Sequence, residues 1–81
     1  MPRLIFTNDS QKTFLQLVRV SSGLSNEELA QLCEVSGRTF RDWVRGKYNI
    51  SKSAAQSLSE KFSVPIPENT AEVNDYWYVN K

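Results

Sequence analysis

Apolar residues recur at helical spacing, at i, i+3 and i+4, in four stretches of the chain that polar segments separate. This spacing predicts helices that run from about residue 10 to 20, from about 25 to 33, from about 36 to 46 and from about 51 to 62. The predicted inner faces are Phe14, Leu17 and Val18 with Leu15 beside them; Leu29, Ala30 and Cys33; Phe40, Trp43 and Val44; and Ala55, Leu58 and Phe62.

Serine residues stand where three of these helices are expected to begin. Ser25 precedes Glu28 by three residues, which is the pattern of a capping box, and Ser36 and Ser51 are natural N-caps. Gly46 lies where a helix commonly ends in a left-handed residue. The connection between the second and third helices is only about three residues long, so the two are expected to meet at a steep angle, as in a helix-turn-helix.

The two ends of the chain have strand character. Residues 4–6 form a short apolar run, and residues 76–79 are Tyr-Trp-Tyr-Val, a sequence of high strand propensity. We expect these runs to pair with each other, because the termini of a domain commonly lie close together. The alternative is that the aromatic run contacts a second protomer, which would give a homodimer through the terminal segments, or a further domain.

The expected fold is therefore an all-α, compact domain of four to five helices, with a small two-stranded annex from the N- and C-terminal segments. We expect one domain over residues 1–81, with a helix-turn-helix core at about residues 25–46 and terminal extensions at residues 1–7 and 68–81. The third helix has unlike faces, because Arg38, Arg41, Asp42 and Arg45 recur on the side opposite the apolar residues.

Cations are concentrated in one part of the chain. The whole chain has a net charge of +1, but residues 36–52 carry five cations and one anion, a net charge of +4. This basic stripe on a slightly acidic body predicts binding to a polyanion, with a solvated charged face as the alternative.

Composition argues against catalysis, metals and membranes. The chain has no histidine and one cysteine, Cys33, so it has no imidazole ligand, no intrachain disulfide and no evident base for a nucleophile. We expect Cys33 to be a structural thiol. No apolar run approaches the ~20 residues of a membrane span, and no secretory signal or glycine-rich phosphate loop occurs. We expect a non-enzymatic, cytoplasmic, nucleoid-associated protein without cofactor, metal, membrane contact or small-molecule substrate.

Residues 24–46, L-S-N-E-E-L-A-Q-L-C-E-V-S-G-R-T-F-R-D-W-V-R-G, resemble the helix-turn-helix of the phage-repressor and Cro type, the xenobiotic-response-element-like family of bacterial regulators. The resemblance extends over about residues 10–67 and rests on a set of matching positions. These are Leu29, Ala30, Val35, Ser36, Thr39, Phe40, Trp43, Arg45 and Gly46.

Two residues depart from the family pattern. Glu34 stands in the turn where the family usually has glycine, and Leu32 stands where a polar residue is usual. If the backbone at Glu34 is left-handed, a residue other than glycine is strained there by ~1 kcal/mol. We expect the terminal segments to cover Leu32.

The resemblance implies that the third helix reads bases in the major groove of double-stranded DNA. Arginine can bond to O6 and N7 of guanine together, and small groups at a helix N-terminus permit close approach. The residues assigned to base reading are Arg38, Arg41, Gly37 and Asp42. For Asp42 the favoured alternative is that its carboxylate holds Arg38 or Arg45 in place.

A second group of residues is assigned to the DNA backbone, because hydroxyls, cations and amides commonly contact phosphate. These residues are Ser36, Thr39, Arg45, Lys47, Tyr48 and Lys52, and Gln11 or Lys12 is expected to reach the backbone as well. The predicted function is sequence-specific DNA binding, by a transcriptional regulator or by one domain of a larger DNA-processing protein. The alternative is a protein-interaction or oligomerisation module that keeps the fold without binding DNA.

Overall fold

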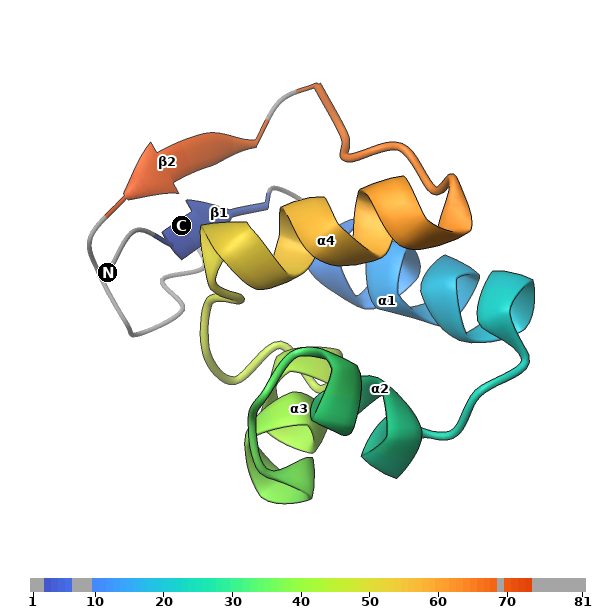
Figure 1. The fold of residues 1–81 in the computed structure, drawn as a ribbon. Coiled ribbons are helices and arrows are strands. Elements are labelled where there is room, and N and C mark those ends of the chain that lie inside the picture. The colour runs from blue at the N-terminus through green and yellow to red at the C-terminus, as the bar shows by residue number, and fades with distance from the viewer. Residues whose placement is uncertain (1–2, 7–9, 69, 74–81) are drawn as a thin grey trace.

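Helices make up most of the chain in the computed structural model, which describes residues 3–6, 10–68 and 70–73 (Figure 1). The elements are β1 (Arg3–Ile5), α1 (Ser10–Ser22), α2 (Asn26–Leu32), α3 (Gly37–Val44), α4 (Lys52–Phe62) and β2 (Ala71–Val73). The prediction of a mostly helical domain with a small two-stranded annex is confirmed.

The serines begin the helices as predicted. Ser25 and Glu28 form a reciprocal capping box at the start of α2. The hydroxyl oxygens of Ser36 and Ser51 accept from the N–H groups of Thr39 and Ala54, at 3.1 and 3.3 Å. These bonds satisfy N–H groups that have no partner inside the helix, so short polar residues fix where α2, α3 and α4 begin.

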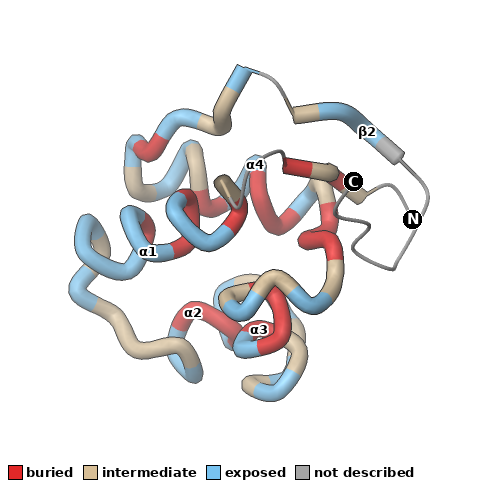
Figure 2. Tube along the Cα trace, turned by 180° about the vertical axis from the view of Figure 1, so that it is seen from behind, coloured by how far each residue is buried: buried red, intermediate tan, exposed pale blue. Residues whose placement is uncertain are grey.

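The helices share one core, and their buried positions face the interior of the molecule (Figure 2). Phe40 and Trp43 of α3 are 0% and 1% exposed, with ring centroids 5.9 Å apart. The other buried apolar residues are Leu4, Phe6, Phe14, Leu15, Val18, Leu29, Ala30, Ile50, Ala54, Ala55, Leu58 and Val64. This core holds α3 by its apolar side and leaves the opposite side at the surface.

The predicted inner face of α1 was wrong in one position. Leu17 is 49% exposed, whereas Leu15 is fully buried. The buried stripe is Gln11, Phe14, Leu15 and Val18, which follows the spacing i, i+3, i+4 and i+7. The first residue of this stripe, Gln11, is polar. A prediction from apolar residues alone therefore omitted it and placed the buried face too close to Leu17.

The terminal sheet forms with a different partner from the one predicted. β1 pairs with β2 antiparallel, with Leu4 opposite Glu72, whereas residues 76–79 lie outside the described residues. β2 is the first extended segment after α4, and the short connection between them brings β2 beside β1. An ion pair between Lys52 and Glu72 joins the start of α4 to β2.

The expectation that the terminal segments cover Leu32 was also wrong, since Leu32 is 42% exposed. Figure 1 shows β1 beside α4, while α2 lies at the other end of the molecule. β1 is held there because Leu4 is buried and its N–H donates to the Ile50 carbonyl at 3.0 Å.

The turn between α2 and α3 contains a left-handed residue, as the sequence analysis considered for Glu34. Glu34 has φ at 59°, in the left-handed region. The next residue, Val35, donates its N–H to the Ala30 carbonyl at 3.0 Å, which returns the chain across the end of α2. Ala30 is 1% exposed, so a small residue lies where α2 meets the core. The turn thus fixes the position of α3 relative to α2.

Candidate nucleic-acid interface

The outer face of α3 and its C-cap carry three exposed arginines. Arg38, Arg41 and Arg45 lie at the surface, whereas Phe40 and Trp43 anchor the opposite face in the core. Because the helix is held by large aromatic groups, its outer side chains start from a rigid support. A protruding, cationic helix of this kind can enter a duplex groove.

Asp42 was expected on this outer face, and the structure corrects that expectation. It is buried to 5% exposure, and its carboxylate forms an ion pair with Arg45. The hydrogen bond from Arg45 lowers the pKa of Asp42 below its ordinary value, with further lowering by the charges of Arg45, Lys47 and Arg38. Asp42 therefore orients Arg45, as the favoured alternative held, and its base-reading role remains an untested prediction.

Gln11 was expected to reach the DNA backbone, and this too is corrected, because its side chain is fully buried. Its amide nitrogen donates to the carbonyls of Trp43 and Tyr48, each at 2.9 Å. Its amide oxygen accepts from the N–H of Ile50 at 3.2 Å. One side chain of α1 thus satisfies three backbone groups at the end of α3 and in the loop that follows, and sets the position of both.

Arg41 forms an ion pair with Glu27 of α2, with Arg41 Nη1 at 2.5 Å from Glu27 Oε1. Both side chains are at least half exposed, at 50% and 63%. The guanidinium lies over the start of α3, because a Cβ at Gly37 would come 3.1 Å from Arg41 Nη1. Two of the predicted base-reading residues are therefore neighbours, because the Arg41 guanidinium lies beside Gly37.

Arg38 is the arginine of α3 that has no ion pair within the described part of the chain. It lies one turn from Asp42, and its charge contributes to the lowered pKa of that carboxyl. Since none of the described carboxylates forms an ion pair with Arg38, its guanidinium can offer N–H groups to an incoming acceptor.

The residues assigned to phosphate lie in α3 and at its ends, in the loop that follows, and at the start of α4. Besides capping α3, the Ser36 hydroxyl donates to Thr39 Oγ1 at 3.0 Å. In the loop, the Lys47 ammonium lies 5.4 Å from the centroid of the Tyr48 ring. Lys52, in the first turn of α4, is paired with Glu72. The structure brings Ser36 and Thr39 together, and it places Lys52 against the terminal sheet.

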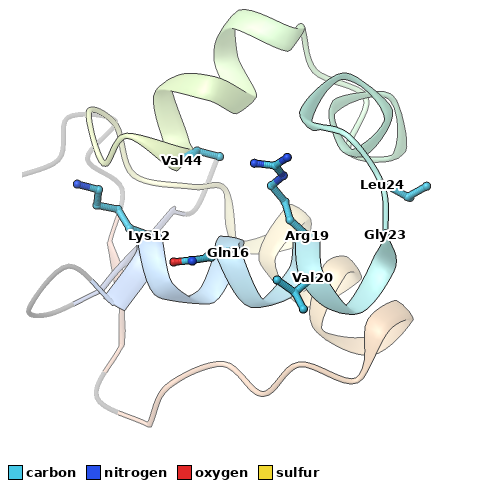
Figure 3. Close-up of a pocket in the computed structure, with 7 residues that line it drawn as sticks. All are labelled: Lys12, Gln16, Arg19, Val20, Gly23, Leu24 and Val44. Atoms are coloured by element: carbon cyan, nitrogen blue, oxygen red, sulfur yellow. The ribbon is translucent and has the colours of Figure 1, made fainter.

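Sequence reasoning missed a groove between α1 and the end of α3. It has a volume of about 650 Å³ and is lined by Lys12, Gln16, Arg19, Val20, Gly23, Leu24 and Val44. Figure 3 shows Arg19 of α1 and Val44 of α3 pointing toward each other across it. A smaller hollow lined by Asn26, Arg41, Val44 and Arg45 shares one wall with the groove.

The linings of both hollows hold cations and no carboxylate. The cations therefore continue from α3 onto α1, through Lys12 and Arg19. The signal was present in the sequence, because Lys12, Gln16 and Arg19 recur at i, i+4 and i+7 and so share one face of a helix.

Cys33 does not have the surroundings of a reactive thiol. Burial raises the pKa of the Cys33 thiol from its ordinary value to about 11, so the group is protonated at neutral pH. Within the described ranges, no cluster of three or more Cys, Asp or Glu side chains could hold a metal ion. None of the described helices has the length and apolar character that a membrane span requires.

Comparison with known protein families identifies a match. A protein-family model described as helix-turn-helix matches residues 15–69. The matched segment includes α2, α3, α4 and most of α1, and it leaves out β1 and β2. No curated protein and no solved structure matches the chain significantly.

Proposed function

Since the chain belongs to the Cro/C1-type helix-turn-helix family of DNA-binding domains, we propose that it binds double-stranded DNA in a sequence-specific manner. In this proposal α3 lies in the major groove, and the protein acts as a transcriptional regulator or as one domain of a larger DNA-processing protein. The observation that carries the proposal is the outer face of α3, where Arg38, Arg41 and Arg45 are exposed above an aromatic anchor.

Arg38 and Arg41 are the proposed base-reading residues. A guanidinium can donate to O6 and N7 of one guanine, which discriminates against other bases by about 1–3 kcal/mol. Gly37, without a side chain, lets the duplex approach the start of α3 closely. Asp42 remains a candidate for accepting from cytosine N4, although its pairing with Arg45 supports an orienting role more directly.

The proposed phosphate contacts surround this reading surface. They comprise Ser36, Thr39, Arg45, Lys47, Tyr48 and Lys52, together with Lys12 and Arg19 of the groove beside α1. Contacts of this kind position the protein on the duplex without reading its sequence. They would also make the affinity fall steeply with added salt, because each neutralised phosphate releases counterions.

The experiment is selection of bound duplexes from a random pool at near-physiological salt. An enriched motif supports the proposal, and no enrichment by the folded protein contradicts it. An inverted repeat with half-sites about 34–36 Å apart would support a dimer that reads one half-site per protomer. A single short motif would support a monomer.

Substitutions then separate the two kinds of contact. The double variant Arg38→Ala, Arg41→Ala should lose preference among sequences while it keeps the wild-type fold. Lys47→Ala should weaken binding to all duplexes equally, and Lys61→Ala, on the exposed side of α4, is the matched control. Unchanged site preference in the double variant would show that α3 does not read the bases.

The second candidate function is a protein-interaction or oligomerisation module. It is favoured by the exposed apolar side chains Leu17, Val20 and Leu32, at 49%, 75% and 42%. Salt discriminates between the two functions, because an apolar protein contact should persist where binding through phosphates is lost. Sedimentation of the protein alone at low and high salt tests whether it self-associates.

A further inference from the structure

The ion pair between Glu27 and Arg41 joins the two helices of the helix-turn-helix at the proposed reading surface. Glu27 lies in the first turn of α2, and Arg41 lies on the outer face of α3. Their charged atoms are 2.5 Å apart, and both side chains remain substantially exposed. The pair is therefore open to solvent on one side and accessible to a duplex.

The position of Gly37 shows how the Arg41 side chain runs. A Cβ at Gly37 would lie 3.1 Å from Arg41 Nη1 and 3.6 Å from Glu27 Cγ. The guanidinium therefore extends back along α3 toward its N-terminus and does not project straight outward. An arginine held in this way has its guanidinium in a defined position, with N–H groups left over for a further acceptor.

Three other described carboxylates have different partners. Asp42 is buried against Arg45, and the Glu28 carboxylate accepts from the Ser25 N–H in the capping box. Glu72 pairs with Lys52 in the terminal sheet region. Glu27 is accordingly the α2 carboxylate that acts directly on an arginine of the reading surface.

We propose that Glu27 is a positioning residue that determines which base Arg41 reads. The inference rests on the proposed function of α3. Two physical effects support it. The ion pair orders the long Arg41 side chain before DNA arrives, which lowers the entropy lost on binding. The carboxylate also repels phosphate oxygens, so it directs Arg41 toward a base acceptor and away from the DNA backbone.

The test compares Glu27→Gln with Glu60→Gln on the selected duplex and on its single-base variants. Both substitutions remove one negative charge, but Glu60 lies exposed on α4. In Glu27→Gln, preference at one base position should fall about 10-fold. Binding to unrelated DNA should tighten, with a salt dependence steeper by about one phosphate contact. Glu60→Gln should keep the wild-type base preference.

Glu27→Asp separates charge from position. It keeps the negative charge but withdraws the carboxylate by one methylene, so base preference should fall while the salt dependence stays close to wild type. A thermal melt of each variant verifies that the fold is retained. Glu27→Asp also tests the proposal if Glu27→Gln fails to fold.

A double-mutant cycle with Arg41→Ala identifies the route of the effect. In the Arg41→Ala background, Glu27→Gln should leave the preference at that base unchanged. The inference is overturned if Glu27→Gln behaves like Glu60→Gln, or if its effect persists without Arg41. If the wild-type protein binds no duplex, the proposed function fails together with it. If the wild-type protein binds a specific site and Glu27→Gln reads it normally, only the inference fails.

Discussion

Glu34 has a strained backbone conformation in the turn between α2 and α3, with φ at 59°. A residue with a Cβ is disfavoured in this region by about 1–2 kcal/mol, whereas glycine adopts it readily. We therefore expect Glu34→Gly to raise the free energy of unfolding by about 0.5–1 kcal/mol, after allowance for the greater freedom of glycine in the unfolded chain. Urea unfolding measures the change.

Glu34→Ala is the control for this prediction. Alanine removes the carboxylate but keeps the Cβ, so the backbone strain remains and no comparable stabilisation should appear. If both variants were equally stabilised, the carboxylate and not the backbone would be the cause. An unchanged or less stable Glu34→Gly variant would contradict the role of this turn.

Asp42 should make the stability depend on pH in the acidic range. Its pKa is lower in the folded protein, chiefly through the hydrogen bond from Arg45, so the ionised form stabilises the fold. This stabilisation is present above the unfolded pKa of about 3.9 and is lost as the pH falls through the lower folded value. Asp42→Asn should thus have a lower melting temperature than wild type at neutral pH. The difference between the two melting temperatures should shrink below about pH 4.

Thermal melts between about pH 7 and about pH 2 test this sign. Glu60→Gln, which alters an exposed carboxylate of α4, serves as the control. A difference between wild type and Asp42→Asn that stays constant, or that grows in acid, would refute the stabilising role of ionised Asp42.

Some residue roles were accessible from sequence and others were not. The left-handed turn at Glu34 could be suspected, because glycine is usual at that position in the family that residues 24–46 resemble. The burial of Asp42 could not be predicted, because its charge suggested a place on the same exposed face as the arginines. Its real partner, Arg45, follows three residues later, so the pairing was one of several that helical spacing allowed.

At the scale of elements, the helix starts were predictable because each cap is a local interaction. Ser25, Ser36 and Ser51 bond to N–H groups three residues away, a distance that a sequence displays directly. The role of Gln11 was hidden, since its partners lie 32, 37 and 39 residues further along the chain. A polar residue in an apolar stripe indicates that such partners exist without identifying them.

Gln11 should be among the least replaceable residues of α1. Gln11→Ala removes the side-chain partner of the Tyr48 carbonyl and of the Ile50 N–H, and it removes one of two donors to the Trp43 carbonyl, which also accepts from the Gly46 N–H. We expect a loss of about 2–4 kcal/mol in unfolding free energy, because each unsatisfied buried group is penalised. Gln56→Ala, at an exposed position of α4, should change stability little by comparison.

Gln11→Glu sharpens this prediction. Glutamate has nearly the same shape, but its carboxylate cannot donate to the two carbonyl oxygens and would repel them. It should therefore be at least as destabilising as Gln11→Ala in the same denaturation experiment. A well-tolerated Gln11→Glu variant would mean that the amide nitrogen is not what holds the loop after α3.

At the scale of the whole molecule, the two-stranded annex was predictable as a feature but not in its pairing. Strand propensity marked the aromatic run at residues 76–79, whereas β2 is Ala71–Val73, a segment without aromatic residues. Which segments pair depends on the path of the loop that connects them, and local strand propensity does not determine that path. Exposed Leu17 and Leu32 likewise depend on how the helices pack together.

The N-terminal segment completes the core, although it lies outside the segment that matches the family model. Phe6 is 2% exposed, and its ring centroid lies 5.7 Å from that of Phe14. Phe6→Ala should destabilise the protein by about 3–5 kcal/mol, because it removes a large side chain from a closed interior. Chemical denaturation measures this loss.

Ile5→Ala is the matched control, because Ile5, the last residue of β1, directly precedes Phe6 and is only half-buried. It should destabilise the protein clearly less than Phe6→Ala. Equal losses from the two variants would contradict the special contribution of the buried Phe6 ring to the core.

The support of α3 has a consequence for how this protein could change its target. Gln11 holds the end of the helix through the carbonyl of Trp43, and Phe40 and Trp43 hold its inner side through the core. The side chains at positions 38 and 41 take part in neither attachment, whereas Arg45 pairs with the buried carboxylate of Asp42. Under the proposed function, a few substitutions at positions 38 and 41 could therefore redirect the domain to another DNA sequence with no compensating change in its interior, which makes these two positions an interchangeable part of the reading surface.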